Sequence, residues 1–181
     1  MSFAAKDPLL TIGKGLTFFM QGVMALAGIV LLILIPVMLI WQDGIAAELT
    51  AELGQQAADF PLLTILALLT LAAIVVGCVF LFFGRLRRII ATVGDGDPFV
   101  PENAKRLTDM AWLLLAVQVL MVPMAGLGLM VAKWADEVGH EDITIDAGLD
   151  LTGLLMVVVL FILARVFRHG TAMRADLEGT V

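Results

Sequence analysis

The sequence has few of the residues from which catalytic and metal sites are made. It contains one cysteine, two histidines and no tyrosine among 181 residues. The single cysteine, Cys78, excludes an internal disulfide and a multi-cysteine metal site, and we interpret it as a small core residue. The histidines, His140 and His169, lack the spacing of a metal-binding pair, and no nucleophile, base and orienting acid occur together. We therefore predict no enzymatic activity, no cofactor and no metal centre.

Charge is absent from the centres of four long apolar runs. These runs cover approximately residues 16–41, 62–84, 110–132 and 149–167, and none has Asp, Glu, Lys, Arg or His in its central part. Each run is near the roughly 20 residues that cross a hydrocarbon core. Apolar residues make up 61% of the chain and the mean hydropathy is +1.02, whereas soluble domains are about 45–50% apolar. The sequence predicts four transmembrane helices with no charged group for a proton relay.

The fourth run is the shortest of the four. It still spans the membrane if Asp150 lies at the outer headgroups while Arg165 extends its aliphatic stem toward the inner ones. We therefore expect Asp150 near the outer end of the bundle.

Positive charge is almost missing from one side of the predicted membrane. Ten of the eleven lysines and arginines lie before the first run, between the second and third, or at the end of the fourth. They are Lys6, Lys14, Arg85, Arg87, Arg88, Lys105, Arg106, Arg165, Arg168 and Arg174. Because basic residues near helix ends resist translocation, both termini are expected in the cytoplasm. The predicted fold is an all-α, antiparallel bundle forming one domain over residues 1–181.

The connections follow from this topology. A cytoplasmic hairpin is expected over 85–109, and outer loops over 42–61 and 133–148. The inner side has ten bases against seven acids, and the outer side one base against ten acids. The basic inner side favours contact with the lipid bilayer, where anionic headgroups attract bases. Three dispersed basic clusters at a membrane surface do not favour direct nucleic-acid binding.

The outer loops contain two recognisable patterns. Ile45, Leu49 and Leu53 recur every four residues, which predicts a short helix. The second loop alternates over 143–145, which predicts an extended segment. It also contains His140, Glu141, Asp142 and Asp146. Oxygen ligands of this kind suit a hard cation, but their spacing matches no known calcium loop, and a solvated acidic loop is favoured.

Small residues form stripes on two of the predicted spans. One stripe consists of Thr70, Ala73, Gly77 and Gly84, and the other of Ala111, Gln118, Ala125 and Ala132. Small side chains allow neighbouring backbones to approach, and a glutamine can hydrogen-bond across such a contact. The stripes are therefore candidate helix-packing surfaces, either inside the bundle or between copies in a homo-oligomer. In a transport role, Gln118 would instead contact the substrate.

The inner segments are more ordered than simple linkers. The apolar pattern continues beyond the second run until Gly94, and Pro101 has the position of the first residue of a new helix. A turn over 95–99 separates these two helices. In the tail, Val166, Gly170, Met173 and Leu177 share one helix face. This face is expected either to pack on the hairpin or to receive a partner helix.

At these inner segments the chain resembles a known family. The loop over 94–107, with its Gly-Asp-Pro-Phe-containing turn before an asparagine-containing helix, and the ending over 167–181 resemble a bacterial membrane family catalogued as domain of unknown function 2975. The resemblance covers nearly the whole chain and the same four-span layout. The family has no assigned activity and no established catalytic residues to transfer.

The resemblance implies a plausible cellular role. Members of the family are often encoded beside small helix-turn-helix regulators, which implies an accessory or regulatory partner of such a protein in the bacterial plasma membrane. The candidate contact residues are Asp95, Asp97, Phe99, Glu102 and Asn103. In the alternative interpretation, Pro98, Phe99 and Asn103 only shape and cap the hairpin. A second function remains open, that of a small oligomeric transport or channel component.

Overall fold

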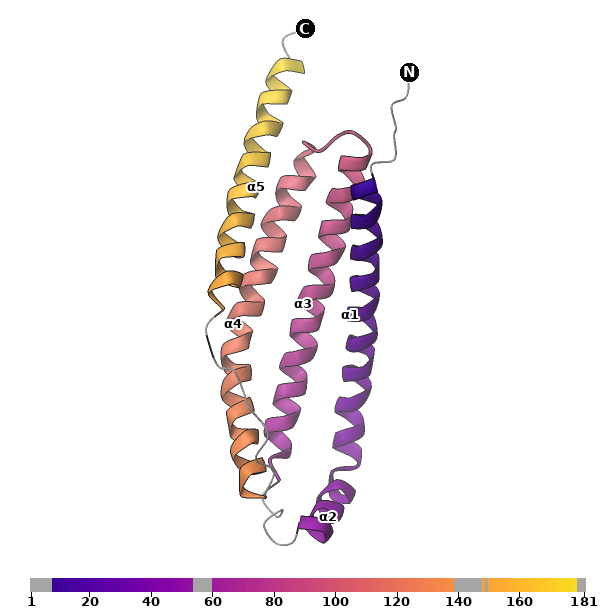
Figure 1. Cartoon of the computed structure of the whole chain (residues 1–181), viewed down its shortest axis with the longest axis vertical. Helices are drawn as coiled ribbons and strands as arrows, with labels where there is room; N and C mark the ends of the chain where they lie inside the picture. The colour runs from indigo at the N-terminus through magenta and orange to yellow at the C-terminus, as the bar shows by residue number, and fades with distance from the viewer. Residues whose placement is uncertain (1–7, 54–59, 139–147, 149, 179–181) are drawn as a thin grey trace. The chain divides into compact units, whose positions relative to one another are not determined.

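The structure is a computed structural model that describes residues 8–53, 60–138, 148 and 150–178. It is all-α. In chain order the helices are α1 (Pro8–Ile40), α2 (Gln42–Leu53), α3 (Leu62–Gly94), α4 (Pro101–Glu137) and α5 (Leu151–Glu178) (Figure 1). The short helix predicted in the first outer loop is confirmed as α2. The predicted extended segment at 143–145 and the acidic group from His140 to Asp146 lie outside the described residues.

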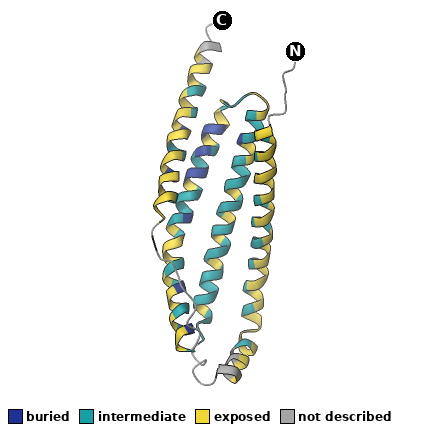
Figure 2. Ribbon diagram, in the orientation of Figure 1, coloured by how far each residue is buried: buried dark blue, intermediate teal, exposed yellow. Residues whose placement is uncertain are grey.

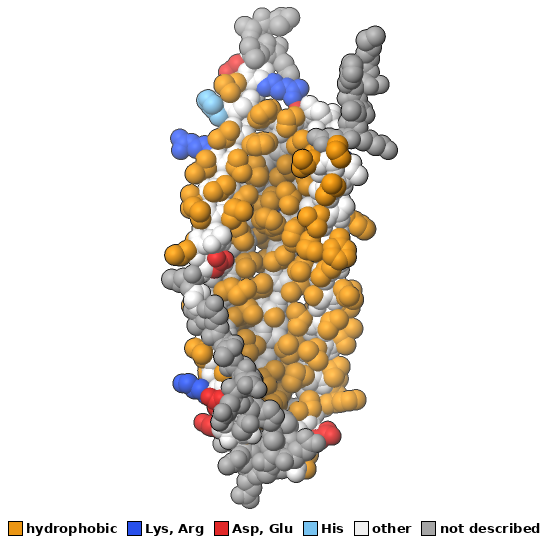
Figure 3. All heavy atoms as spheres, in the orientation of Figure 1, with side chains coloured by type: hydrophobic (Ala, Val, Ile, Leu, Met, Phe, Trp, Pro, Cys, Tyr) orange, Lys and Arg blue, Asp and Glu red, His pale blue; other side chains and the backbone are white. Residues whose placement is uncertain are grey.

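Four of the helices are suited to a membrane. α1, α3, α4 and the part of α5 from Leu151 to Arg174 are long and apolar enough to cross one, and at most 11% of the most apolar window of each is buried. Hydrophobic side chains cover most of the visible surface of these helices (Figure 3). An apolar surface of this extent is unfavourable in water and needs to be covered by lipid or by protein. The prediction of four membrane-spanning helices is thus confirmed in length and composition.

The chain divides into two compact units. The first contains residues 1–25, 77–118 and 150–181, and the second contains 26–76 and 119–149. α1, α3 and α4 therefore contribute to both units, whereas α5 belongs to the first alone. The buried core of the first unit joins α3, α4 and α5 through Ile89, Leu107, Met110 and Ala164. Figure 2 shows buried residues concentrated on the first turns of α4.

α1 approaches α3 at glycines. In the first unit, a Cβ added to Gly13 would lie 3.5 Å from Ile90, and one added to Gly84 would lie 3.1 Å from the amide nitrogen of Gln21. In the second unit, a Cβ added to Gly28 would lie 3.7 Å from Val76. These contacts show how small residues bring the two helices together in each unit.

The second unit also contains an aromatic contact. Phe60, just before α3, meets Trp134 of α4 edge to face, with ring centroids 5.4 Å apart. This geometry aligns the positive ring edge with the negative ring face. The start of α3 is thereby held against the end of α4.

α3 ends in a glycine-dependent cap. The Gly96 N–H donates to the Val93 carbonyl at 3.1 Å, and the Asp97 N–H donates to the Thr92 carbonyl at 3.0 Å. This is the Schellman pattern, in which the residue after the helix takes a left-handed conformation. Gly96 has a φ of 83°, which a residue without Cβ adopts at low cost. The predicted helix end at Gly94 and helix start at Pro101 are confirmed, and the left-handed residue is Gly96.

Candidate functional site

Asn103 closes the turn between α3 and α4. Its side-chain NH₂ donates to the Thr92 hydroxyl at 2.7 Å and to the Pro98 carbonyl at 2.9 Å. Its side-chain oxygen accepts from Arg106 at 2.7 Å. The residue is 0% exposed, so its own amide group has no contact with water, while its partners Thr92 and Arg106 are partly exposed. One amide thus joins the end of α3, the turn and the first turns of α4.

The tail of α5 packs on this turn. The Phe99 and Phe167 rings lie with centroids 5.4 Å apart, and a Cβ added to Gly170 would come within 2.9 Å of the Phe99 ring. The Thr171 hydroxyl donates to the Phe99 carbonyl at 3.0 Å. We call these residues, together with Asn103 and the ion pair described next, the turn–tail cluster.

An ion pair adds to the same contact. Arg174 of α5 donates to the carboxylate of Asp97 in the turn. Both side chains are partly exposed, with 49% and 41% of their areas accessible. A partly exposed pair of this kind contributes little stability, but it selects one orientation of the tail over others.

The five candidate contact residues have different environments. Asp95 and Glu102 are exposed, and Phe99 is 41% exposed despite its contact with α5. Asp97 is partly covered and paired with Arg174. The prediction of a surface contact is wrong for Asn103, because a side chain with no exposed area cannot reach a partner. Asn103 instead stabilises the hairpin through its hydrogen bonds to Thr92 and Pro98, which agrees with the alternative interpretation.

The tail uses a different helix face from the one predicted. Gly170 does pack on the turn, but Val166 and Met173 are 55% and 53% exposed. The side chain of Leu177 lies outside the described residues. The contacting face instead follows Phe167, Thr171 and Arg174, at the i, i+4 and i+7 positions. The aromatic ring and two polar groups of this face match the turn better than the purely aliphatic face.

A second polar contact joins α4 to the start of α5. The Gln118 side chain donates to the Asp150 backbone carbonyl at 3.0 Å and to its carboxylate at 3.3 Å. The same carboxylate accepts the Gly153 N–H at 2.9 Å, which is an N-cap interaction. A Cβ on Gly153 would lie 1.9 Å from the Gln118 amide nitrogen. The glutamine therefore packs directly on the bare backbone of Gly153.

This contact corrects the expected position of Asp150. The sequence places Asp150 at the outer headgroups, but the structure places it beside Gln118, eight residues inside the predicted 110–132 span. At 1.5 Å per residue this is about 12 Å from Met110. α5 accordingly lies along α4 residues 101–118 (Figure 1). A carboxylate therefore does lie at the level of the apolar run of α4.

The small-residue stripes make several separate contacts. Ala111 is fully buried and Gln118 contacts α5, whereas Gly84 faces Gln21 of α1. Ala73, Ala125 and Ala132 are partly exposed, Thr70 is exposed and bonds its own helix at Leu66, and a Cβ added to Gly77 would meet nothing within 4 Å. Gly77 leaves a small open site on α3.

Sequence reasoning missed the contributions of Thr92, Thr171 and Arg174, and it missed the contact of Asp150 with Gln118. All four residues are polar, and a polar residue in or beside a helix is a weak signal shared by many surface residues. Among the described residues, no three His, Cys, Asp or Glu side chains gather as a metal site. An ion pair between Arg85 of α3 and Asp109 of α4, at 3.2 Å, further connects the two helices.

Together, the four apolar helices and the polar turn define a multi-pass membrane protein with an ordered connection between its middle helices. The chain belongs to the family described as "Protein of unknown function (DUF2975)", which matches residues 45–181. The resemblance predicted from the two inner segments is thereby confirmed. No curated protein and no solved structure matches the chain.

Proposed function

We propose that this protein is a non-enzymatic membrane partner of a small cytoplasmic helix-turn-helix regulator, which it holds through the turn–tail cluster. The observation that carries the proposal is the packing of the α5 tail on the α3–α4 turn. This contact presents Asp95, Phe99 and Glu102 on an ordered support. A surface that is already ordered loses less conformational entropy on binding than a flexible loop.

The proposal includes a cytoplasmic location for this cluster in a bacterial plasma membrane. The first unit contains ten of the eleven lysines and arginines, and the second contains Lys133 alone. The positive-inside rule then assigns the turn and both termini to the cytoplasm, and the four spans to an antiparallel arrangement.

The exposed chemistry of the cluster suits a protein partner. Phe99 is an aromatic residue with 41% of its area exposed next to the acidic residues Asp95 and Glu102. Aromatic anchors surrounded by polar residues contribute much of the energy at protein interfaces. The acidic groups add charge complementarity toward a regulator with a basic DNA-binding surface.

The test is purification of the tagged protein from its native cells in mild detergent, with mass spectrometry of the proteins that co-elute. We expect one small DNA-binding protein in stoichiometric amount, lost when Asp95, Asp97 and Phe99 are replaced together by alanine. Phe99→Ala alone should weaken the capture with unchanged yield. Recovery of the protein only with copies of itself would refute the proposal.

Two control variants distinguish the exposed side chains of the turn from the α5 tail that packs against them. Replacing Leu129, Asp136 and Glu137 of the second unit by alanine removes one exposed apolar and two exposed acidic side chains, and should leave capture intact. Arg174→Ala removes the pairing of Asp97 without changing the acidic turn. If Arg174→Ala alone abolishes capture, the partner depends on the tail position and not on the turn side chains.

A second candidate function is a small oligomeric transport or channel component. The Asp150–Gln118 contact favours it, because an ionisable group at the level of an apolar span commonly marks a pathway. Gly77 offers an open site for close approach of another copy. Gly77→Leu should then convert a homo-oligomer into monomers in crosslinking or native mass spectrometry. A monomer in the unmodified protein would exclude this candidate.

A further inference from the structure

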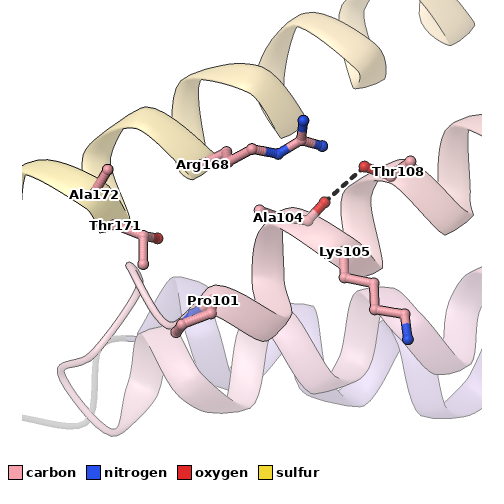
Figure 4. Close-up of a pocket in the computed structure, with 7 residues that line it drawn as sticks. All are labelled: Pro101, Ala104, Lys105, Thr108, Arg168, Thr171 and Ala172. Carbon is pink, nitrogen blue, oxygen red and sulfur yellow. Dashed lines mark hydrogen bonds between the residues drawn. The ribbon is translucent and has the colours of Figure 1, made fainter. Parts of the chain in front are cut away.

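A cavity lies between the first turns of α4 and the tail of α5, beside the turn–tail cluster. Its volume is about 440 Å³, and seven residues from α4 and α5 line it (Figure 4). Pro101, Ala104 and Ala172 provide apolar walls. The other four lining residues are Lys105, Thr108, Arg168 and Thr171. Figure 4 shows the Arg168 guanidinium extending over the space toward Thr108, whereas the Lys105 side chain extends away from Arg168.

Two cations in this cavity have no acidic partner in the described part of the chain. Among the nearby carboxylates, Asp97 pairs with Arg174 and Asp109 pairs with Arg85, while Glu102, three residues before Lys105, is exposed. The threonine hydroxyls donate to backbone carbonyls, Thr108 to Ala104 and Thr171 to Phe99. Lys105 and Arg168 are therefore the groups with hydrogen-bond donors to offer a ligand, which must be anionic.

The position of the cavity adds an apolar requirement. Lys105 precedes the third predicted apolar run by five residues, and Arg168 directly follows the fourth. Trp112, one turn beyond Thr108, is 60% exposed and packs edge to face on Phe161, with ring centroids 5.5 Å apart. Tryptophan favours the level of the headgroups, so the cavity opens where headgroups meet acyl chains.

We propose that this cavity binds one anionic phospholipid, with its phosphate on the Arg168 guanidinium, the flexible Lys105 side chain turned toward it, and its acyl chain along the Trp112–Phe161 pair. Guanidinium presents two parallel N–H groups to phosphate oxygens, and lysine adds a point charge. The apolar wall of Pro101, Ala104 and Ala172 contacts the glycerol and upper acyl carbons. The site is independent of any regulator.

The test is native mass spectrometry of the delipidated full-length protein, titrated with phosphatidylglycerol or phosphatidylcholine. We expect one tightly bound phosphatidylglycerol. The double substitution Lys105→Gln with Arg168→Gln should weaken its binding about 30-fold, because each base near an anionic headgroup contributes about fivefold in affinity. Ala172→Phe fills the cavity and retains both charges, and should also reduce the bound phosphatidylglycerol.

The matched control is Arg87→Gln with Arg88→Gln, which removes two exposed bases of α3 outside the cavity. It should change phosphatidylglycerol binding less than about twofold. Three results would overturn the site: an equal loss in this control, equal binding of phosphatidylcholine, or retention of phosphatidylglycerol in both cavity variants. Stoichiometric binding of inorganic phosphate with no preference for the lipid would also overturn it.

Discussion

Replacing Asn103 by alanine should lower the Tm of the purified protein by about 6–12 °C. The substitution removes three side-chain hydrogen bonds at a fully buried position and leaves the Pro98 carbonyl without its amide donor. Buried polar groups that lose their partners cost about 1–3 kcal/mol each, and a loss of about 3 kcal/mol has this effect on Tm in a chain of this size. Tryptophan fluorescence during heating in detergent measures the change.

The neighbouring residue supplies the control for this experiment. Glu102 lies one position away in the same first turn of α4 and is exposed. Glu102→Ala should shift Tm by about 2 °C or less, because exposed side chains contribute little. A Tm for Asn103→Ala within that same range would show that the turn does not depend on this amide.

Replacing Gly153 by leucine should displace the start of α5 from α4. Even a Cβ at this position would lie 1.9 Å from the Gln118 amide nitrogen and 2.7 Å from its amide carbon. A leucine side chain therefore forces the glutamine away from Asp150. Overpacking of this kind costs about 1–3 kcal/mol, or about 2–12 °C in Tm.

Trp112 provides a local signal for this displacement, because it packs on Phe161 of α5. In a variant with Trp41→Phe and Trp134→Phe, Trp112 is the one remaining tryptophan. Gly153→Leu should change its emission maximum. Gly22→Leu should not, since a Cβ on Gly22 would meet nothing within 4 Å. Unchanged emission and Tm in Gly153→Leu would contradict the close contact of Gln118 with α5.

The helices were predictable because local signals determine them. The apolar runs predict α1, α3, α4 and α5, and the Gly94 and Pro101 signals predict the ends of the hairpin helices. The buried role of Asn103 was one of two interpretations that the sequence left open. Its burial depends on contacts with Thr92 and Pro98, which the sequence separates by 11 and 5 residues.

The position of α5 along α4 was not predictable from hydropathy. An apolar run predicts the length of a helix, but the position of that helix along its neighbour depends on specific contacts. Here the Gln118–Asp150 bond and the bare backbone of Gly153 set that position. The helix face used by the tail was missed for a related reason, since apolar periodicity cannot identify a contact made by Thr171 and Arg174.

The bond between Thr171 and residue 99 is made to the main chain of the turn. A carbonyl oxygen is present whatever side chain follows it, so this attachment of α5 does not depend on the identity of residue 99. The Thr171 bond therefore survives a substitution of Phe99, whereas the contact of the Phe99 ring with Phe167 and Gly170 does not. The turn thus holds α5 in two ways, one through its main chain and one through an aromatic side chain that is also partly exposed.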